Sequence, residues 1–234
     1  GGASLWGQIF PRGGCVSQQA VLSYDQIGES GQNHGGRETR MAFSQEENAL
    51  IRQSLLAEGR RRAVTVGMRK TSVEQLTEAA GISKGSFYKY FESKEMLFLA
   101  VLEDIHTEVY QVARDALEAG RDLPPEDCAA ETLLAACRCL SETGAMRFLE
   151  ADAADLLRRL PPRLKAEHYH DDETHIRALL EESGLSPRGG TELAAATVRG
   201  LVLTVSHREQ IGEQYPKVLE TLVRGACREL FGEE

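Results

Sequence analysis

The sequence predicts an all-α fold, and three features carry that prediction. Leu, Ala, Glu and Arg dominate, while runs of Val, Ile and Thr, which favour strands, are scarce. Apolar residues recur at helical spacing along most of the 234 residues, of which 41% are hydrophobic, enough for a sizeable core. Prolines stand where helices can begin, because a proline lacks the amide hydrogen that the first turn leaves unbonded. We therefore expect about nine helices.

Three segments of the chain differ in composition. Residues 1–40 hold nine glycines and no sustained apolar period, so we expect a flexible leader that is disordered or not native. A basic arm for the minor groove is the alternative, but three acidic residues there balance three basic ones. Residues 41–95, the head, carry nine Lys/Arg against seven Asp/Glu, and residues 96–234, the body, carry fifteen against twenty-six. The net charge of -9 therefore does not exclude nucleic-acid binding, because the acid is concentrated in the body.

The head is expected to contain three helices, of which the last two form a helix-turn-helix. The first should run over residues 44–67, broken loosely by Gly59. Thr71 and Glu74 have the spacing of a capping box for the next helix, which should end at Gly81. Ser83 can cap the following short helix.

The short helix after Ser83 has two unlike faces. At about 100° per residue, Phe87 and Phe91 share the face that must pack inward. The opposite face is small and basic, and tyrosines lie on its flanks. Hydroxyls, ammonium groups and a glycine that permits close approach suit a DNA backbone. We predict DNA contacts from Thr71, Ser83, Lys84, Gly85, Ser86, Tyr88, Lys89, Tyr90 and Lys94.

Residues 80–97 read A-G-I-S-K-G-S-F-Y-K-Y-F-E-S-K-E-M-L, and this stretch closely resembles the DNA-binding domain of the tetracycline-repressor (TetR) family. The alternative is an unrelated helical hairpin with surface lysines. It explains less well why the capping residue, the glycine turn, the inward phenylalanines and the outward basic face all fit one motif. The resemblance implies that the residues from Lys84 to Lys94 named above meet DNA, with Lys89 at a variable position.

The resemblance also implies a function. It implies a ligand-responsive transcriptional regulator, a repressor, that binds double-stranded operator DNA as a homodimer and is released by a small-molecule effector. Two alternatives remain open at this point. One is a non-regulatory DNA-binding architectural protein, and the other is a helical small-molecule carrier with a vestigial DNA head.

The body should begin with a long helix capped by Ser93, whose apolar stripe extends over five turns. Further helices are expected near 126–143, 145–159, 162–183, 188–210 and 216–231. The last two carry more apolar surface than a terminal hairpin needs, which predicts a two-fold dimer packed as a four-helix bundle. Burial within one subunit is the alternative. The predicted interface residues are Ala194, Val198, Leu201, Val205, Leu219, Leu222, Val223 and Ala226.

Enzymatic and membrane functions are not indicated. The sequence contains no nucleotide-binding or hydrolase motif and no run of about 18 apolar residues, and its five scattered cysteines fit reduced thiols in a cytoplasm. We expect no cofactor and no metal. His168, Asp172 and His175 share a helix face, but their charged surroundings favour a solvated face or a lid over a pocket.

The effector site is the least determined part of the sequence. Cys137 and Cys139 point to different helix faces, so we expect buried small side chains in preference to a thiol sensor or haem ligand. A mostly apolar effector is expected, because small-molecule pockets are mostly apolar. Candidate lining residues are His106, Tyr110, Cys137, Phe148, Thr204 and His207.

Overall fold

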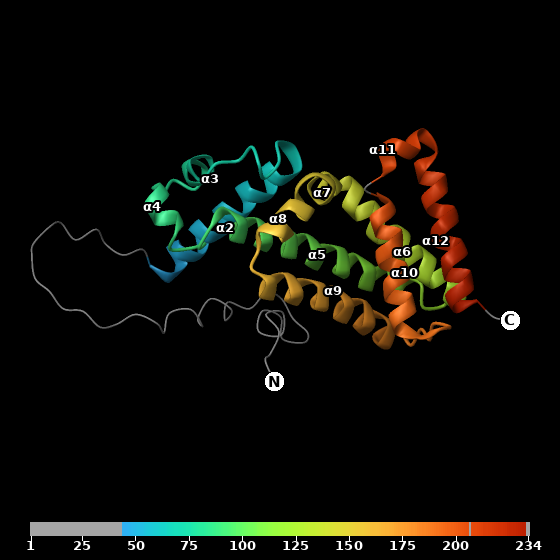
Figure 1. Ribbon diagram of the computed structural model, residues 1–234. Coiled ribbons are helices and arrows are strands. Elements are labelled where there is room, and N and C mark those ends of the chain that lie inside the picture. The colour runs from blue at the N-terminus through green and yellow to red at the C-terminus, as the bar shows by residue number, and fades with distance from the viewer. Residues whose placement is uncertain (1–43, 206, 233–234) are drawn as a thin grey trace, which may run out of the picture.

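The computed structural model describes residues 44–232 except residue 206, with the side chains of 169–172 and 205 also left undescribed (Figure 1). Within that range the chain is helical and contains no strand, as the sequence predicts. The predicted leader, residues 1–40, lies outside the described residues. The elements are α2 (Gln45–Thr65), α3 (Val73–Ala79), α4 (Lys84–Phe87), α5 (Lys94–Ala119), α6 (Pro125–Glu142), α7 (Ala145–Phe148), the π-helical turn η2 (Leu149–Ala153), α8 (Ala154–Arg159), α9 (Pro162–Ser183), α10 (Gly190–Val205), α11 (Arg208–Ile211), the 3-10 turn η3 (Gly212–Gln214) and α12 (Tyr215–Phe231).

Helices α2, α3 and α4 form the three-helix head. Ser44 caps α2 with a full capping box: its hydroxyl accepts from the Glu47 amide at 3.1 Å, and the Glu47 carboxylate accepts from the Ser44 amide at 2.7 Å. The expected break near the middle of α2 does not occur. Gly59 lies buried within an uninterrupted helix, where α2 packs against Leu97 and Val101 of α5.

The start of α3 corrects one prediction. Ser72, not Thr71, caps the helix, and Gln75, not Glu74, completes the capping box. The Thr71 hydroxyl instead donates to the Gly67 carbonyl at 2.8 Å, and the side chain is buried. Two hydroxyl residues in tandem, each followed three positions later by an acid or amide, made both registers possible.

The remainder of the helix-turn-helix agrees with prediction. Gly81 has φ +68°, a left-handed conformation that glycine adopts without strain, and it turns the chain between α3 and α4. Ser83 caps α4, and Ser93 caps α5. Phe87 is fully buried and packs on Phe91 with ring centroids 6.0 Å apart. The head therefore has its own apolar centre, which fixes α4 against α3.

The long helix α5 runs from the head through the body (Figure 1). Helices α6 and α9 pack against it, α12 packs on α6, and α10 contacts both α9 and α12. Phe98 of α5 lies 6.0 Å from Phe148 of α7, ring centroid to ring centroid, and both side chains are fully buried. The same buried cluster includes Leu55 and Phe87 of the head, so one apolar core joins head and body.

Candidate nucleic-acid interface and effector site

Helix α4 presents a small, basic surface to solvent. Lys84, Gly85 and Lys89 are exposed, and Tyr88 is 53% exposed, although its neighbour Phe87 is fully buried. The Tyr88 ring meets the Phe87 ring edge-on at 5.4 Å, which holds the tyrosine at the surface with its hydroxyl accessible. This surface offers a phenol, two ammonium groups and a backbone open to close approach. It is suited to binding phosphates and base edges.

Hydrogen bonds within the head orient this surface. The Ser86 amide donates to the Ser83 hydroxyl at 3.2 Å, and the two hydroxyl oxygens lie 2.9 Å apart. Lys84 pairs with Glu74 of α3 at 2.7 Å, and both side chains are more than half exposed. The hydrogen bond between them lowers the pKa of the Glu74 carboxyl and raises that of the Lys84 ammonium. Exposed pairs of this kind contribute little to stability, so Lys84 can readily exchange Glu74 for a phosphate.

Three of the predicted contact residues point inward in this structure. The Tyr90 hydroxyl donates to the Asn48 side-chain oxygen at 2.7 Å, and the Lys94 ammonium donates to the carbonyls of Met68 at 3.0 Å and Thr71 at 2.8 Å. The Thr71 side chain is buried, as described above. These side chains brace the head, and their contacts with DNA stay predictions.

Sequence reasoning missed two side chains of α2 that support α4. Arg52 lies over the Phe91 ring, 4.4 Å from its centroid, and donates to the Tyr90 carbonyl at 3.3 Å. Asn48 lies one helical turn before Arg52, and its side-chain oxygen accepts a hydrogen bond from the Tyr90 hydroxyl. The sequence did offer a signal for this contact. Asn48 and Arg52 are polar residues beside the inward-facing apolar residues of α2, and half-buried polar side chains need hydrogen-bond partners.

Comparison with known proteins agrees with this arrangement. A family model described as "Bacterial regulatory proteins, tetR family" matches residues 55–101. The HTH-type transcriptional repressor DhaR of Mycobacterium sp. (strain GP1) is 33% identical over 75 residues, which cover 32% of this chain and 37% of that protein. The repressor NemR of Escherichia coli (strain K12) is 35% identical over 69 residues, covering 30% and 35%.

A solved structure extends the likeness beyond the head. The crystal structure of a putative TetR-family transcriptional regulator from Mesorhizobium loti superposes with a TM-score of 0.58 over 77% of this chain and 94% of that one, at 19% identity. The match to the tetR family of bacterial regulatory proteins therefore lies in residues 55–101, and the described chain shares the fold of that solved TetR-family structure. The matched part spans about a third of the length of the curated relatives, and the structural likeness, at its low identity, is one of fold.

Two of the predicted effector residues lie between α5 and α9. The His106 ring stacks on His168 with centroids 5.2 Å apart, and the Tyr110 ring stacks on His175 at 4.6 Å. Both rings of each pair are at least partly covered. In this structure His106 and Tyr110 therefore fill a helix interface.

The other four predicted effector residues are dispersed. Phe148 is fully buried in the core, the Thr204 hydroxyl donates to the Leu201 carbonyl at 2.6 Å, and His207 is exposed. Burial raises the pKa of the Cys137 thiol to about 11, so it stays protonated at neutral pH. A protonated thiol is a poor redox sensor and a poor ligand for haem or metal, which favours the interpretation of Cys137 as a buried apolar residue.

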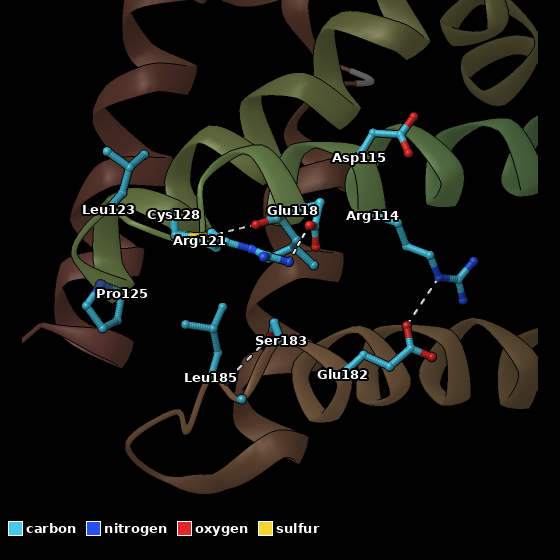
Figure 2. Close-up of a pocket in the computed structure, with 12 residues that line it drawn as sticks. Arg114, Asp115, Glu118, Arg121, Leu123, Pro125, Cys128, Glu182, Ser183 and Leu185 are labelled. Carbon is cyan, nitrogen blue, oxygen red and sulfur yellow. Dashed lines mark hydrogen bonds and ion pairs between the residues drawn. The ribbon is translucent and has the colours of Figure 1, made fainter.

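A large cleft of the body lies elsewhere, where the end of α5, the start of α6 and the end of α9 meet (Figure 2). Its volume is about 560 Å³, within the range typical of small-molecule sites. Ion pairs Arg114–Glu182, at 3.3 Å, and Arg121–Glu118 lie at its rim. Its apolar lining is Leu117, Leu123, Pro125, Cys128 and Leu185. None of the six predicted effector residues lines it, because it is built from helix ends far apart in sequence.

The predicted interface residues differ in their exposure within one protomer. Ala194, Leu201, Leu219 and Val223 are at most 9% exposed and pack within the subunit, so their stripe serves the protomer core. Val198 and Ala226 are half-buried, and the side chain of Val205 lies outside the described residues. Of the predicted residues whose side chains are described, only Leu222 is exposed, at 42%. The exposed apolar surface of α10 lies on its opposite face, at Leu193 and Leu203, with the small residues Ala196 and Gly200 between them.

The described residues contain neither a metal-binding cluster nor a membrane-spanning helix. Among them, no group of three or more His, Cys, Asp and Glu side chains is placed to hold a metal ion. The side chain of Asp172, from the candidate group with His168 and His175, lies outside the description. No described helix is both long and apolar enough to cross a membrane.

Proposed function

We propose that this chain is a ligand-responsive, DNA-binding transcriptional regulator of the repressor type, acting in the cytoplasm without enzymatic activity. The observation that carries the proposal is the open face of α4, which is small, basic and tyrosine-flanked and rests on the fully buried Phe87. This combination suits a helix that approaches a DNA backbone and its base edges closely. The proposed contact residues are Ser83, Lys84, Gly85, Ser86, Tyr88 and Lys89, with Thr71, Tyr90 and Lys94 bracing them.

The proposal includes a two-fold dimer. Leu193, Ala196, Gly200 and Leu203 are three, four and three residues apart, which places them on one face of α10. On neighbouring α12, Leu222 is also exposed. Large apolar side chains alternating with small ones allow two copies of this face to approach closely as a four-helix bundle. Two heads then bind two half-sites of a near-palindromic operator.

The effector is proposed to enter the helical body. The cleft of about 560 Å³ bounded by α5, α6 and α9 is the best candidate, and its apolar floor with a charged rim favours an amphipathic small molecule. Release from DNA requires only that this molecule bind the operator-incompetent spacing of the two heads more tightly than the competent one. Occupancy then shifts the population away from DNA.

In vitro selection from a random-sequence duplex library tests the DNA-binding part of the proposal. The selected duplex and a scrambled version of it are then compared by gel shift at two salt concentrations. We expect a two-fold symmetric sequence bound at least about 1,000-fold more tightly than its scramble. Equal, strongly salt-dependent binding to both duplexes supports an architectural protein, and no binding to either supports a carrier with a vestigial head.

A further inference from the structure

A buried carboxylate joins the body to the head. Asp152 belongs to the π-helical turn η2, and its side chain is 3% exposed. One carboxylate oxygen accepts from the Met68 amide at 2.7 Å, and the other lies 3.3 Å from the Arg69 guanidinium. Gly67 has φ +89°, and a Cβ atom there would come within 2.6 Å of the carboxylate. The loop between α2 and α3 therefore fits closely around Asp152.

The same loop is held from the head side. Lys94, in the first turn of α5, donates to the carbonyls of Met68 and Thr71, and the Thr71 hydroxyl donates to the Gly67 carbonyl. Helix α3 begins directly afterwards, capped by Ser72. Asp152 thus binds the amide of Met68, and Lys94 binds its carbonyl. A shift of Asp152 would therefore displace the loop that leads into α3, the first helix of the helix-turn-helix.

The π-helical turn also contacts the far side of the body. Glu150, two residues before Asp152, pairs with Arg208 of α11 at 3.4 Å. Residues two apart on a helix point in nearly opposite directions, because each residue turns the helix by about 100°. One short turn therefore places one carboxylate on the head and another on α11. Such π-helical turns occur often at functional sites.

The energetics suit a contact that is made and broken. The hydrogen bond to the Met68 amide is charge-assisted and therefore strong. The Arg69 side chain is 63% exposed, so its ion pair is weak and it stays hydrated when it leaves. Beside this contact, a cleft of about 230 Å³ lined by Val66, Lys70 and Arg147 gives the loop room to move.

We propose that Asp152 is a positioning residue that latches the DNA-binding head to the body, and that the π-helical turn transmits displacement of Arg208 to the head. This inference rests on the proposed regulatory function and names its route of regulation. A ligand that draws α11 away from Glu150 moves the same turn that carries Asp152. The latch then releases Met68, and α3 loses its fixed position relative to α5.

Hydrogen–deuterium exchange on the full chain tests the latch. Asp152→Ala should speed exchange in peptides spanning residues 66–72 at least about tenfold, because the main acceptor of a buried amide is lost. Asp152→Asn keeps an oxygen acceptor and should change exchange by about threefold or less. Asp155→Asn is the matched control, since Asp155 pairs only with Arg158 and Arg159 of its own helix among the described contacts. Unchanged exchange in Asp152→Ala, or an equal increase throughout α6 and α12, overturns the latch.

Transmission is tested from the α11 side. Arg208→Ala should speed exchange in residues 66–72 about two- to fivefold, and adding it to Asp152→Ala should have no further effect, because both changes open one latch. Arg163→Ala, which removes a pair confined to α9, is the control. Additive effects, or no effect of Arg208→Ala on residues 66–72, contradict transmission through η2.

A DNA measurement separates this inference from the proposed function. The probe is the duplex that the wild-type chain selects from a random library. Asp152→Ala should bind it at least about tenfold more weakly than wild type, at a temperature where circular dichroism shows both proteins folded, because the heads are no longer preorganised. Failure of the wild-type selection contradicts DNA binding, whereas a selected duplex bound equally well by Asp152→Ala contradicts only the latch.

Discussion

Replacing Leu222 by Glu should split the dimer while leaving the protomer folded. Leu222 is 42% exposed on α12, whereas Leu219, one turn earlier, is 9% exposed. Glu at position 222 stays in contact with water in the monomer. In a dimer the same carboxylate is enclosed by apolar side chains, where an unpaired charge is strongly disfavoured.

The size of the effect follows from the exposed fraction of Leu222. Full burial of a leucine side chain is worth about 1.5–3 kcal/mol, so the 42% left exposed can contribute about 0.6–1.3 kcal/mol when a partner covers it. A two-fold interface doubles this to about 1.3–2.5 kcal/mol, which alone raises the dimer dissociation constant about 8- to 60-fold. Burial of the introduced carboxylate adds to that figure.

Analytical ultracentrifugation across a concentration series measures the dissociation constant, and thermal melting checks the protomer. Leu219→Glu is the matched variant. Its carboxylate would be buried within the protomer and should unfold it, whereas Leu222→Glu should separate the protomers without unfolding them. A Leu222→Glu protein that sediments as an undisturbed dimer and still binds its selected duplex would refute the reasoning. The exposed faces of α10 and α12 would then not form the interface.

Four further expectations concern the head and the leader. Tyr88→Phe should weaken binding to the selected duplex by about 0.5–1.5 kcal/mol in gel-shift titrations and leave melting unchanged, because one hydrogen bond is lost while the ring still packs. Phe87→Ala should lower the free energy of unfolding by about 3–5 kcal/mol in denaturant titration; a value near zero would place the ring outside the core. Glu74→Gln should tighten DNA binding about two- to threefold, because it frees Lys84 and removes a carboxylate beside the phosphates; weaker binding would show that the ion pair orients Lys84. Deleting residues 1–40 should alter neither melting temperature nor DNA affinity, and a tenfold loss of affinity would identify a functional arm.

Features set by local sequence were predicted well. The Ser83 cap, the Gly81 turn and the inward pair Phe87 and Phe91 depend on neighbours within one or two turns, and the structure confirms each of them. The body helices beginning at Pro125 and Pro162 were predicted for the same reason. Short-range backbone and packing preferences are readable in a sequence, since the interacting residues are close along the chain.

Features set by tertiary contacts were not predicted. Helix α10 carries apolar residues on two faces, and both the stripe through Ala194 and Leu201 and the one through Leu193 and Leu203 have helical spacing. Only the packing of α10 against α9 and α12 decides that the first faces inward. The predicted effector residues do not line the large cleft for a related reason. Leu117 and Leu185, which both line the large cleft, are separated by five helical elements.

Lys94 shows most clearly why a residue's position within a motif does not fix its role. Its place at the start of α5 favours phosphate binding, and the resemblance to the TetR family implies the same. In the structure its ammonium binds two carbonyls of the α2–α3 loop, more than twenty residues earlier. The other side of that loop binds Asp152, more than eighty residues later.

A lysine that holds this loop influences DNA binding even without touching a phosphate, because the loop sets where α3 begins and therefore where α4 is presented. Loss of DNA affinity on replacing Lys94 is consequently no proof of a phosphate contact. The salt dependence distinguishes the two roles: a lost phosphate contact lowers its slope by about one unit, whereas a lost brace leaves the slope unchanged.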